Sequence, residues 1–299
     1  MSLAPRIVAV GEILWDLLPD GDQPGGAPAN FAYHARALGN TVHLISRVGH
    51  DPLGERLLNH LEVNNLDSSL IQRDPDAPTG TVSVEIRPGG HPTYTIHENV
   101  AWDHIEVTEE AEQIVSQCHA ICFGTLAQRH SRTRASLLHL LKTSPPHAKR
   151  VFDVNLRQHF YSDEIIRTSL EQSSLLKVND EELPVIAAAA GCSGSDATIA
   201  HSLLEKYRLE LIALTRGSAG STLFARDQRS DLPAPPISVR DTIGAGDSFT
   251  AALLTGLLRG KPLAECHRLA SSLAAWVCTQ PGATPSPPQT ILQSLTSSP

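Results

Sequence analysis

Long apolar runs and an excess of basic charge are both missing from this sequence. No stretch of 18 consecutive apolar residues occurs, so no segment is expected to span a membrane. Lys and Arg together number 24, against 32 Asp and Glu, which leaves a net charge of −8. A nucleic acid or an anionic membrane surface would find no basic run to bind. We therefore expect neither a nucleic-acid partner nor a membrane partner.

Paired cysteines are missing as well. The five cysteines show no C-x-x-C spacing and no secretory framework, which favours buried free thiols over a pairing of Cys118 with Cys122. The first residues, MSLAPRIVAVGE, have no charged segment followed by a long apolar core, so no signal peptide is expected. These features are typical of a protein of the reducing cytoplasm, and we predict a cytoplasmic location.

Two common nucleotide-binding motifs are also absent. The chain contains no G-x-x-x-x-G-K-[ST] P-loop, and Phe249 stands where a dinucleotide fingerprint would have its third glycine. An oxidoreductase built around a dinucleotide is therefore disfavoured. If the ligand is a nucleotide, its phosphates must be bound by backbone amides, a helix N-terminus, a few basic side chains and a metal ion.

Short apolar runs alternate with helix-like stretches over most of the chain. This pattern is typical of βαβ units around a mainly parallel sheet, and it predicts a single α/β domain over residues 1–299. Strands are expected at residues 6–11, 42–48, 120–123, 150–154, 175–178 and 211–215. Helices are expected at residues 29–38, 53–64, 131–141, 180–190, 196–207, 247–258, 263–279 and 289–295.

One stretch departs from the βαβ pattern. Residues 79–102 alternate in steps of two around Pro88-Gly89-Gly90, which predicts a β-hairpin. Because a hairpin fits poorly into a parallel sheet, we expect it to form a small lid together with an extended segment at about residues 12–18. The alternative is an antiparallel edge strand of the main sheet. Lids of this kind exclude water from a reaction site.

The sharpest chemical signal is the segment DTIGAGDSF at residues 241–249. Gly244 and Gly246 let the backbone turn tightly and direct N–H groups at one point, where a helix begins with its positive dipole end. This arrangement suits the negative charge of a phosphoryl group in transfer. The carboxylate of Asp247 can then accept the proton of an attacking hydroxyl. The alternative is an ordinary helix cap after a glycine turn.

A second segment, GGAPAN at residues 25–30, opens an earlier expected helix. Its paired glycines allow a polar ligand to approach the backbone, and Asn30 offers both donors and an acceptor. Asp16 lies among apolar neighbours in the expected lid strand, where a lone carboxylate is costly unless something pairs with it. Sugar hydroxyls are suitable partners for both. The alternatives are helix capping for Asn30 and a solvated strand end for Asp16.

In their order and separation, these two segments resemble the two signatures of the ribokinase-like (PfkB) carbohydrate kinases. The segment KVNDEE at residues 177–182 is similar to the N-x-x-E segment of that family, and TRGSAG at residues 215–220 is similar to its turn under the nucleotide phosphates. The resemblance extends from Val8 to Pro288. It implies a three-layer α/β/α ribokinase-like fold with a mainly parallel central sheet, a small β-sheet lid, and use of ATP and Mg²⁺.

The resemblance also implies roles for individual residues. Asp247 would be the catalytic base, beside an anion hole formed by Gly244, Ala245 and Gly246. The residues implied for ATP binding are Asn179, Thr215, Arg216, Gly217 and Gly220, together with Gly244 and Gly246. Asn179 and Glu182 would act indirectly on Mg²⁺. Related enzymes bind K⁺ mainly through backbone carbonyls, and the matching positions are Asp241, Ile243, Val277, Gln280, Gly282 and Ser286.

Substrate choice follows from finer similarities. The GGAPANFA segment and the ENVAWD segment at residues 98–103 resemble the fructokinase branch, while Ala27 stands where the ribokinase branch has Lys. The implied substrate-binding residues are Asp16, Gly25, Gly26, Asn30, Trp102 and Arg157. Fructose, giving fructose 6-phosphate and ADP, is the first expectation. A 2-keto-3-deoxygluconate kinase is the second, because fructokinases and these enzymes share a D-x-N-x-R run at residues 153–157, and Arg157 suits a carboxylate. A ribokinase-type activity is a further alternative.

A different class of protein is a nucleotide- or sugar-binding protein that kept the fold and lost the chemistry. It is disfavoured because the expected base, Asp247, and both glycines of the expected anion hole are present. An exposed lid edge would invite strand pairing between two copies, so a homodimer through the lid is a further expectation.

Overall fold

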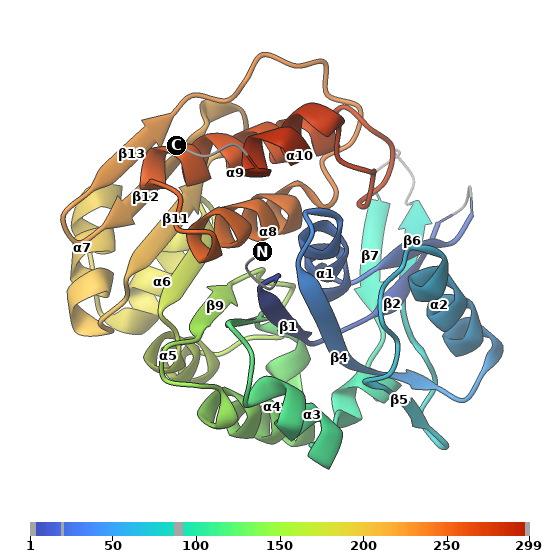
Figure 1. Ribbon diagram of the computed structural model, residues 1–299. Helices are drawn as coiled ribbons and strands as arrows, with labels where there is room; N and C mark the ends of the chain where they lie inside the picture. Colours follow the sequence, from blue (N-terminus) through green and yellow to red (C-terminus); the bar gives the residue numbers. More distant parts are fainter. Residues whose placement is uncertain (1–3, 19–20, 87–91, 297–299) are drawn as a thin grey trace.

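The computed structural model describes residues 4–18, 21–86 and 92–296, and it shows a nine-stranded sheet with helices on both faces (Figure 1). The strand order is β13-β12-β11-β10-β9-β8-β1-β4-β5, in which the β11–β12 and β12–β13 pairs are antiparallel and the other neighbours pair in parallel. The strands are β1 (Arg6–Val10), β4 (Thr41–Gly49), β5 (Ile71–Asp74), β8 (Ala120–Phe123), β9 (Lys149–Asp153), β10 (Leu175–Asn179), β11 (Leu211–Thr215), β12 (Ser221–Ala225) and β13 (Arg229–Leu232).

Side chains of each central strand alternate between two apolar cores, one on each face of the sheet. In β1, Ile7 and Ala9 face one core while Val8 and Val10 face the other, because successive side chains of a strand point in opposite directions. The first core is covered by α1 (Ala27–Ala37), α2 (Pro52–Val63), α8 (Ala245–Leu258), α9 (Leu263–Cys278) and α10 (Gln289–Thr296). The second is covered by α3 (Glu109–Val115), α4 (Ser131–Thr143), α5 (Asp163–Gln172), α6 (Leu183–Ala190) and α7 (Asp196–Lys206). The expected three-layer fold is confirmed.

The six expected strands and eight expected helices are all present, with shifted ends. The helix expected from residue 180 begins at Leu183, because the chain first makes a turn after β10. The helix expected from residue 247 begins two residues earlier, at Ala245. The expectation missed β5 and β13, which form the two edges of the sheet and carry polar residues that mask a strand pattern. It also missed β12, α3 and α5.

A separate four-stranded sheet, here called the small sheet, lies beside α1 and α2 (Figure 1). Its order is β3-β2-β6-β7, with strands β2 (Leu14–Leu17), β3 (Gln23–Gly25), β6 (Gly80–Ile86) and β7 (Pro92–Ile96). The alternative of an edge strand in the main sheet is therefore wrong. The expected turn at residues 88–90 lies outside the described residues. The expected hairpin was too long, since Trp102 belongs to a 3₁₀ turn, Ala101–His104 (η1).

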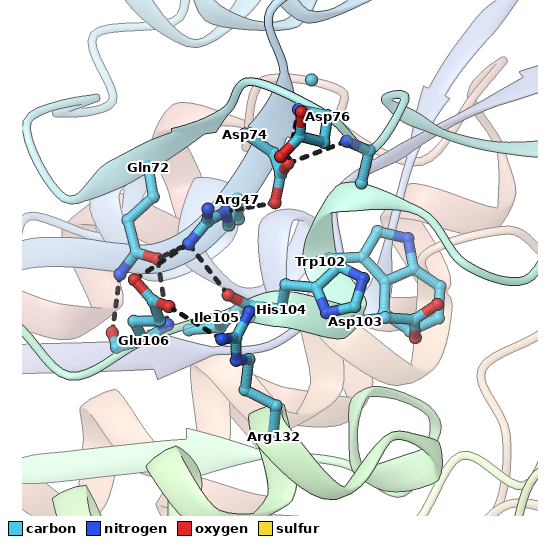
Figure 2. Close-up of polar contacts among 12 residues, drawn as sticks. Arg47, Gln72, Asp74, Asp76, Trp102, Asp103, His104, Ile105, Glu106 and Arg132 are labelled. Carbon is cyan, nitrogen blue, oxygen red and sulfur yellow. Dashed lines mark hydrogen bonds and ion pairs between the residues drawn. The ribbon is translucent and has the colours of Figure 1, made fainter.

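Arg47 of β4 anchors both connections of the β6–β7 hairpin to the body (Figure 2). Its Nε lies 2.7 Å from Asp74 Oδ2, at the end of β5, and its Nη1 donates to the backbone carbonyl of His104 at 3.0 Å. The other carboxylate oxygen of Asp74 accepts from the N–H groups of Asp76 and Ala77, on the connection that leads into β6. One guanidinium thus ties together the entry to β6 and the exit from β7.

All five cysteines are free, which confirms the expectation of unpaired thiols; three of them, Cys118, Cys122 and Cys266, are buried. Within the described ranges, no helix combines the length and apolar character needed to cross a membrane.

The second core depends on Phe152 of β9, which is fully buried and stacks on Phe123 with ring centroids 5.4 Å apart. Replacing Phe152 with Ala should lower the free energy of unfolding by about 3–5 kcal/mol, because it removes buried apolar area and leaves a cavity. Urea denaturation measures this loss. Val63→Ala on α2 is the control, since Val63 is 81% exposed and its truncation should change stability by less than about 0.5 kcal/mol. Equal losses for the two variants would contradict the assignment of this core.

Candidate active site

A cavity opens at the carboxyl ends of β1, β8 and β9, next to the first turns of α1 and α8. Ligand sites in parallel α/β sheets form at this edge. Apolar residues and backbone make up much of the wall, and three carboxylic acids from separate segments complete it. The lining residues are Glu12, Ala27, Pro28, Phe31, Cys122, Phe123, Gly124, Thr125, Leu126, Asp153, Asn155 and Asp247.

The first turn of α8 presents open backbone donors to this region. Gly244 precedes the helix with φ +76°, a left-handed conformation that glycine adopts without strain, and its Cα packs against the backbone of Ala283. No side chain caps the helix. The first N–H groups of a helix have no intrahelical acceptor. In α8 the Ala245 N–H donates to the Thr242 carbonyl at 3.3 Å, so the N–H groups of Gly246 and Asp247 are the ones that remain for a ligand, at the positive end of the helix dipole.

A hydrogen bond joins the two segments that the sequence singled out. Asn30 Nδ2 donates to Asp247 Oδ2 at 2.9 Å, although the two residues are 217 positions apart. Asn30 lies in the first turn of α1 and is 7% exposed, and α1 packs directly against α8. The structure thus places the expected sugar-binding amide and the expected base in contact.

The other expected sugar-binding residues near the N-terminus lie close by. Gly26 has φ +109°, and a Cβ there would come within 2.5 Å of the Glu12 carbonyl, so only glycine fits before α1. Asp16 of β2 faces Gly25 of β3, where an added Cβ would lie 2.6 Å from its Oδ2. Burial raises the pKa of Asp16, and the charge of Arg157 opposes this rise. Asp16, Gly25, Gly26 and Arg157 therefore border the same region.

The pKa of Asp247 is raised to about 6. Burial is the main cause, and the negative charge of Asp153 adds to it; the hydrogen bond from Asn30 and the charges of Lys177 and Arg157 act in the opposite direction. Near neutral pH this balance leaves Asp247 mostly ionised and able to accept a proton. A group that must gain and lose a proton at working pH has its most useful pKa in this range.

A buried ion pair lies directly under the first turn of α8. Lys177 Nζ is 3.0 Å from Asp153 Oδ1, and Thr250 Oγ1 donates to Asp153 Oδ2 at 2.7 Å. A Cβ on Gly246 would lie 2.8 Å from Lys177 Nζ, so the ammonium lies next to the glycine turn. Sequence reasoning gave neither Lys177 nor Asp153 a role. The signal that could have identified them is that each is a charged residue next to apolar residues in a buried strand.

Glu12 is the third residue that sequence reasoning missed, since it was included only within the expected lid segment. It lines the cavity, is 3% exposed, and its pKa is raised to about 7, first by burial and also by the charge of Asp247. Its own backbone N–H, Arg157 and Arg129 lower the pKa. An acidic residue directly after a buried strand was the signal that could have identified it.

The residues expected at the nucleotide phosphates lie at the carboxyl ends of β10 and β11 and in the turn after β11, at the same edge of the sheet. Asn179 and Thr215 are register partners on these neighbouring strands. Arg216 lies in the turn after β11, where its Nη2 donates to Thr222 Oγ1 at 2.5 Å. Its backbone N–H donates to the Gly220 carbonyl, which closes the turn over Gly217. These contacts bring the expected phosphate turn together with the N-x-x-E segment.

The positions expected for K⁺ also converge. Asp241 accepts from the N–H groups of Ile243 and Gly282, at 3.0 and 3.1 Å. The carbonyl of Val277 accepts from Gln280 N–H, and that of Ser286 accepts from the Trp276 indole. Two loops from distant parts of the sequence therefore meet beside α8. In the part of the chain that the structure describes, no group of three or more His, Cys, Asp or Glu side chains could hold a metal ion.

The two remaining substrate residues differ in exposure. Trp102 is completely buried, with the Arg129 guanidinium 3.9 Å from its ring centroid, so in this structure it offers no surface to a ligand. The expected direct contact between Trp102 and a sugar is therefore not found, and Trp102 is instead part of the apolar core. Arg157, in contrast, is exposed on the loop after β9.

The nine-stranded sheet between helix layers, the separate small sheet and the carboxylate at the start of α8 are features of the ribokinase-like fold. The chain belongs to the pfkB family carbohydrate kinases, whose family description matches residues 21–290. It is thus a carbohydrate kinase.

Individual relatives agree with this assignment. The sugar kinase PH1459 from Pyrococcus horikoshii, described as uncharacterized, is 29% identical over 94% of this chain and 92% of its own length. A crystal structure of that protein in complex with ATP has a TM-score of 0.82, at 28% identity, covering 97% of this chain and 99% of the other. A fructokinase from Klebsiella pneumoniae is 31% identical over 90% of this chain and 88% of its own.

Replacing Glu12 with Gln should make the protein more stable than the wild type at pH 8 but not at pH 5. A carboxyl whose pKa rises from 4.5 to about 7 on folding destabilises the folded state as pH increases through this range, by up to about 3 kcal/mol. Thermal or urea unfolding at several pH values measures the difference. Glu62→Gln on the exposed face of α2 is the control. A difference between Glu12→Gln and wild type that does not grow with pH would contradict the burial of an ionisable group here.

Proposed function

We propose that this carbohydrate kinase is a fructokinase, which transfers the γ-phosphoryl group of ATP to fructose and releases fructose 6-phosphate and ADP. The observation that carries the proposal is the contact between Asn30 and Asp247 beside the uncapped first turn of α8. This contact joins a sugar-binding segment to a candidate base at the point where a phosphoryl group would be transferred. Relatives described as fructokinases, at about 30% identity, favour fructose as the acceptor.

In this proposal Asp247 accepts the proton of the attacking sugar hydroxyl as the bond to phosphorus forms. The N–H groups around Gly244, Ala245 and Gly246 stabilise the negative charge on the phosphoryl oxygens, because they are fixed before the reaction begins. The Lys177 ammonium under this turn contributes positive charge on the same side. Burial of the site excludes water, which would otherwise hydrolyse ATP.

ATP and Mg²⁺ fit the residues that surround α8. Asn179, Thr215, Arg216, Gly217 and Gly220 form the expected phosphate turn, and the PH1459 complex with ATP supports nucleotide binding by this fold. Mg²⁺ would offset the charge of the triphosphate, with Asn179 and Glu182 acting indirectly. K⁺ would bind between the loops of Asp241 and Ser286. The carboxylate of Asp241 already organises both loops.

The sugar would lie between the small sheet and the body, in contact with Asp16, Gly25, Gly26, Asn30 and Arg157. The small sheet would act as a lid, with the chain working as one catalytic domain. Pairing of two copies through the edge of this sheet stays a prediction. The exposed Arg157 favours one second candidate, a 2-keto-3-deoxygluconate kinase, because a guanidinium binds a carboxylate strongly.

Replacing Asp247 with Asn should reduce kcat by about two to four orders of magnitude, because a positioned general base contributes that much, while ATP still binds. Wild-type kcat should fall as pH drops below about 6, since protonation removes the acceptor. Steady-state kinetics across pH 5–8, with ATP binding measured by calorimetry, tests both statements. A variant that keeps more than about a tenth of wild-type kcat would show that the base lies elsewhere.

Substrate choice is tested by kcat/KM for fructose, ribose and 2-keto-3-deoxygluconate on the unmodified protein. Fructose should be preferred, because buried polar groups penalise a sugar that leaves them unpaired. Arg157→Gln should lower kcat/KM far more for the sugar acid than for fructose, since it removes a charge-assisted contact. Preference for ribose or the sugar acid would reject the fructokinase proposal. ATP binding without turnover of any sugar would point to a binding protein.

A further inference from the structure

The N-x-x-E segment forms a reciprocal pair of hydrogen bonds, like that of a capping box, across the turn between β10 and α6. The side-chain oxygen of Asn179 accepts from the Glu182 N–H at 2.7 Å, and Glu182 Oε2 accepts from the Asn179 N–H at 3.0 Å. This reciprocal pair satisfies backbone donors at the helix start and accounts for the spacing of the two residues. It occupies only one of the two carboxylate oxygens of Glu182.

The second oxygen reaches a different part of the chain. Glu182 Oε1 accepts from the backbone N–H of Leu156 at 2.9 Å, across 26 residues of sequence, and Glu182 is 6% exposed. Hydrogen bonds from backbone N–H groups to a buried carboxylate are among the stronger ones in proteins. One buried side chain therefore links the turn after β10 to the loop after β9.

That loop has a demanding backbone conformation. Asn155 and Gln158 have φ angles of +45° and +49°, in the left-handed region that costs energy for residues other than glycine. Such a conformation persists only where surrounding contacts hold it. On one side the Thr125 hydroxyl contacts the carbonyls of Val154 and Asn155, at 2.8 and 3.2 Å. On the other side, the Glu182 carboxylate accepts from the Leu156 N–H.

The loop holds Arg157 next to the acidic residues of the cavity. Its positive charge lowers the pKa of Glu12, Asp16 and Asp247, so the guanidinium acts electrostatically on all three carboxyl groups. The side chain is exposed, and its Nη1 donates to the carbonyl of the adjacent Leu156. The direction of Arg157 thus depends on the backbone at Leu156, which Glu182 holds.

We infer that Glu182 is a positioning residue for the sugar: by binding the Leu156 N–H it fixes the loop that presents Arg157, and so couples the nucleotide-side turn to the sugar side. The inference rests on the proposed function, with Arg157 at the sugar. It gives Glu182 a role distinct from the indirect Mg²⁺ role that family resemblance implies. The two roles make different kinetic predictions.

Glu182→Gln tests the inference. A glutamine has one acceptor oxygen, so it can serve only one of the two backbone N–H groups and turns an N–H₂ group toward the other. We expect the KM of the sugar to rise about tenfold or more, as for loss of a hydrogen bond to a charged group. At saturating Mg²⁺ the KM of ATP should change less than about twofold, and any change in the Mg²⁺ requirement reports the separate indirect role of Glu182. A shift in the Mg²⁺ requirement with an unchanged sugar KM would overturn the inference.

A double-mutant cycle tests whether Glu182 acts through Arg157. If it does, Glu182→Gln should have little further effect on kcat/KM in an Arg157→Gln background, because the group it positions is gone. The same fold loss in both backgrounds would contradict the inference. Glu182→Asp is a second variant that keeps the charge but is too short to serve both donors, and we expect it also to raise the sugar KM.

Ser195→Ala is the matched control for lost helix capping. Ser195 caps α7 by accepting from the Thr198 N–H, and no residue of α7 lines the cavity where the sugar would bind. This variant should lower the unfolding temperature and leave the sugar KM unchanged. If the control also raised the sugar KM, the rise caused by Glu182→Gln would be explained by general destabilisation, and the inference would be rejected. Absence of sugar kinase activity in the wild type would instead reject the proposed function.

Discussion

The hydrogen bond from Asn30 to Asp247 is the constraint around which this site is organised, because it joins the first turns of two helices from opposite ends of the chain. Each helix begins with a glycine in the left-handed or a related positive-φ conformation, at Gly26 and Gly244, where a larger residue would collide with neighbouring backbone. These glycines let the two helix starts approach the carboxyl edge of the sheet. The proposed sugar-binding segment and the candidate base then face the same cavity.

Charge balance is the second constraint, since this cavity holds more carboxyl groups than an apolar wall would tolerate alone. Asp153 is neutralised by Lys177 and hydrogen-bonded by Thr250. Asp247 and Glu12 lack such a close cation, and both have raised pKa values. The protein therefore stores a destabilising interaction at the site, which fits a carboxylate that must exchange a proton during turnover.

Two charged side chains connect separate segments around this centre. Arg47 ties the entry to β6 and the exit from β7 to β4 (Figure 2). Glu182 ties the loop of Arg157 to the turn after β10. Arg47 binds the Asp74 carboxylate and the His104 carbonyl, and Glu182 binds the N–H groups of Leu156 and Asn179. Each is buried or nearly so, and water therefore competes little with these contacts.

Local patterns determined much of the fold: alternating and helical periodicity located six strands and eight helices, and glycine spacing marked the starts of α1 and α8. The edge strands β5 and β13 were not predicted from the sequence. Strands at the edge of a sheet are less covered by helices, so they tolerate polar residues that hide the apolar pattern. The sequence also identified Asp247 and Asn30 as candidates. Only the tertiary structure revealed their contact, the burial of Trp102 and the positions of Glu12 and Lys177. The physical reason is that burial and electrostatic coupling depend on neighbours far apart in the sequence, such as Asn30 and Asp247 at 217 positions, which no local pattern records.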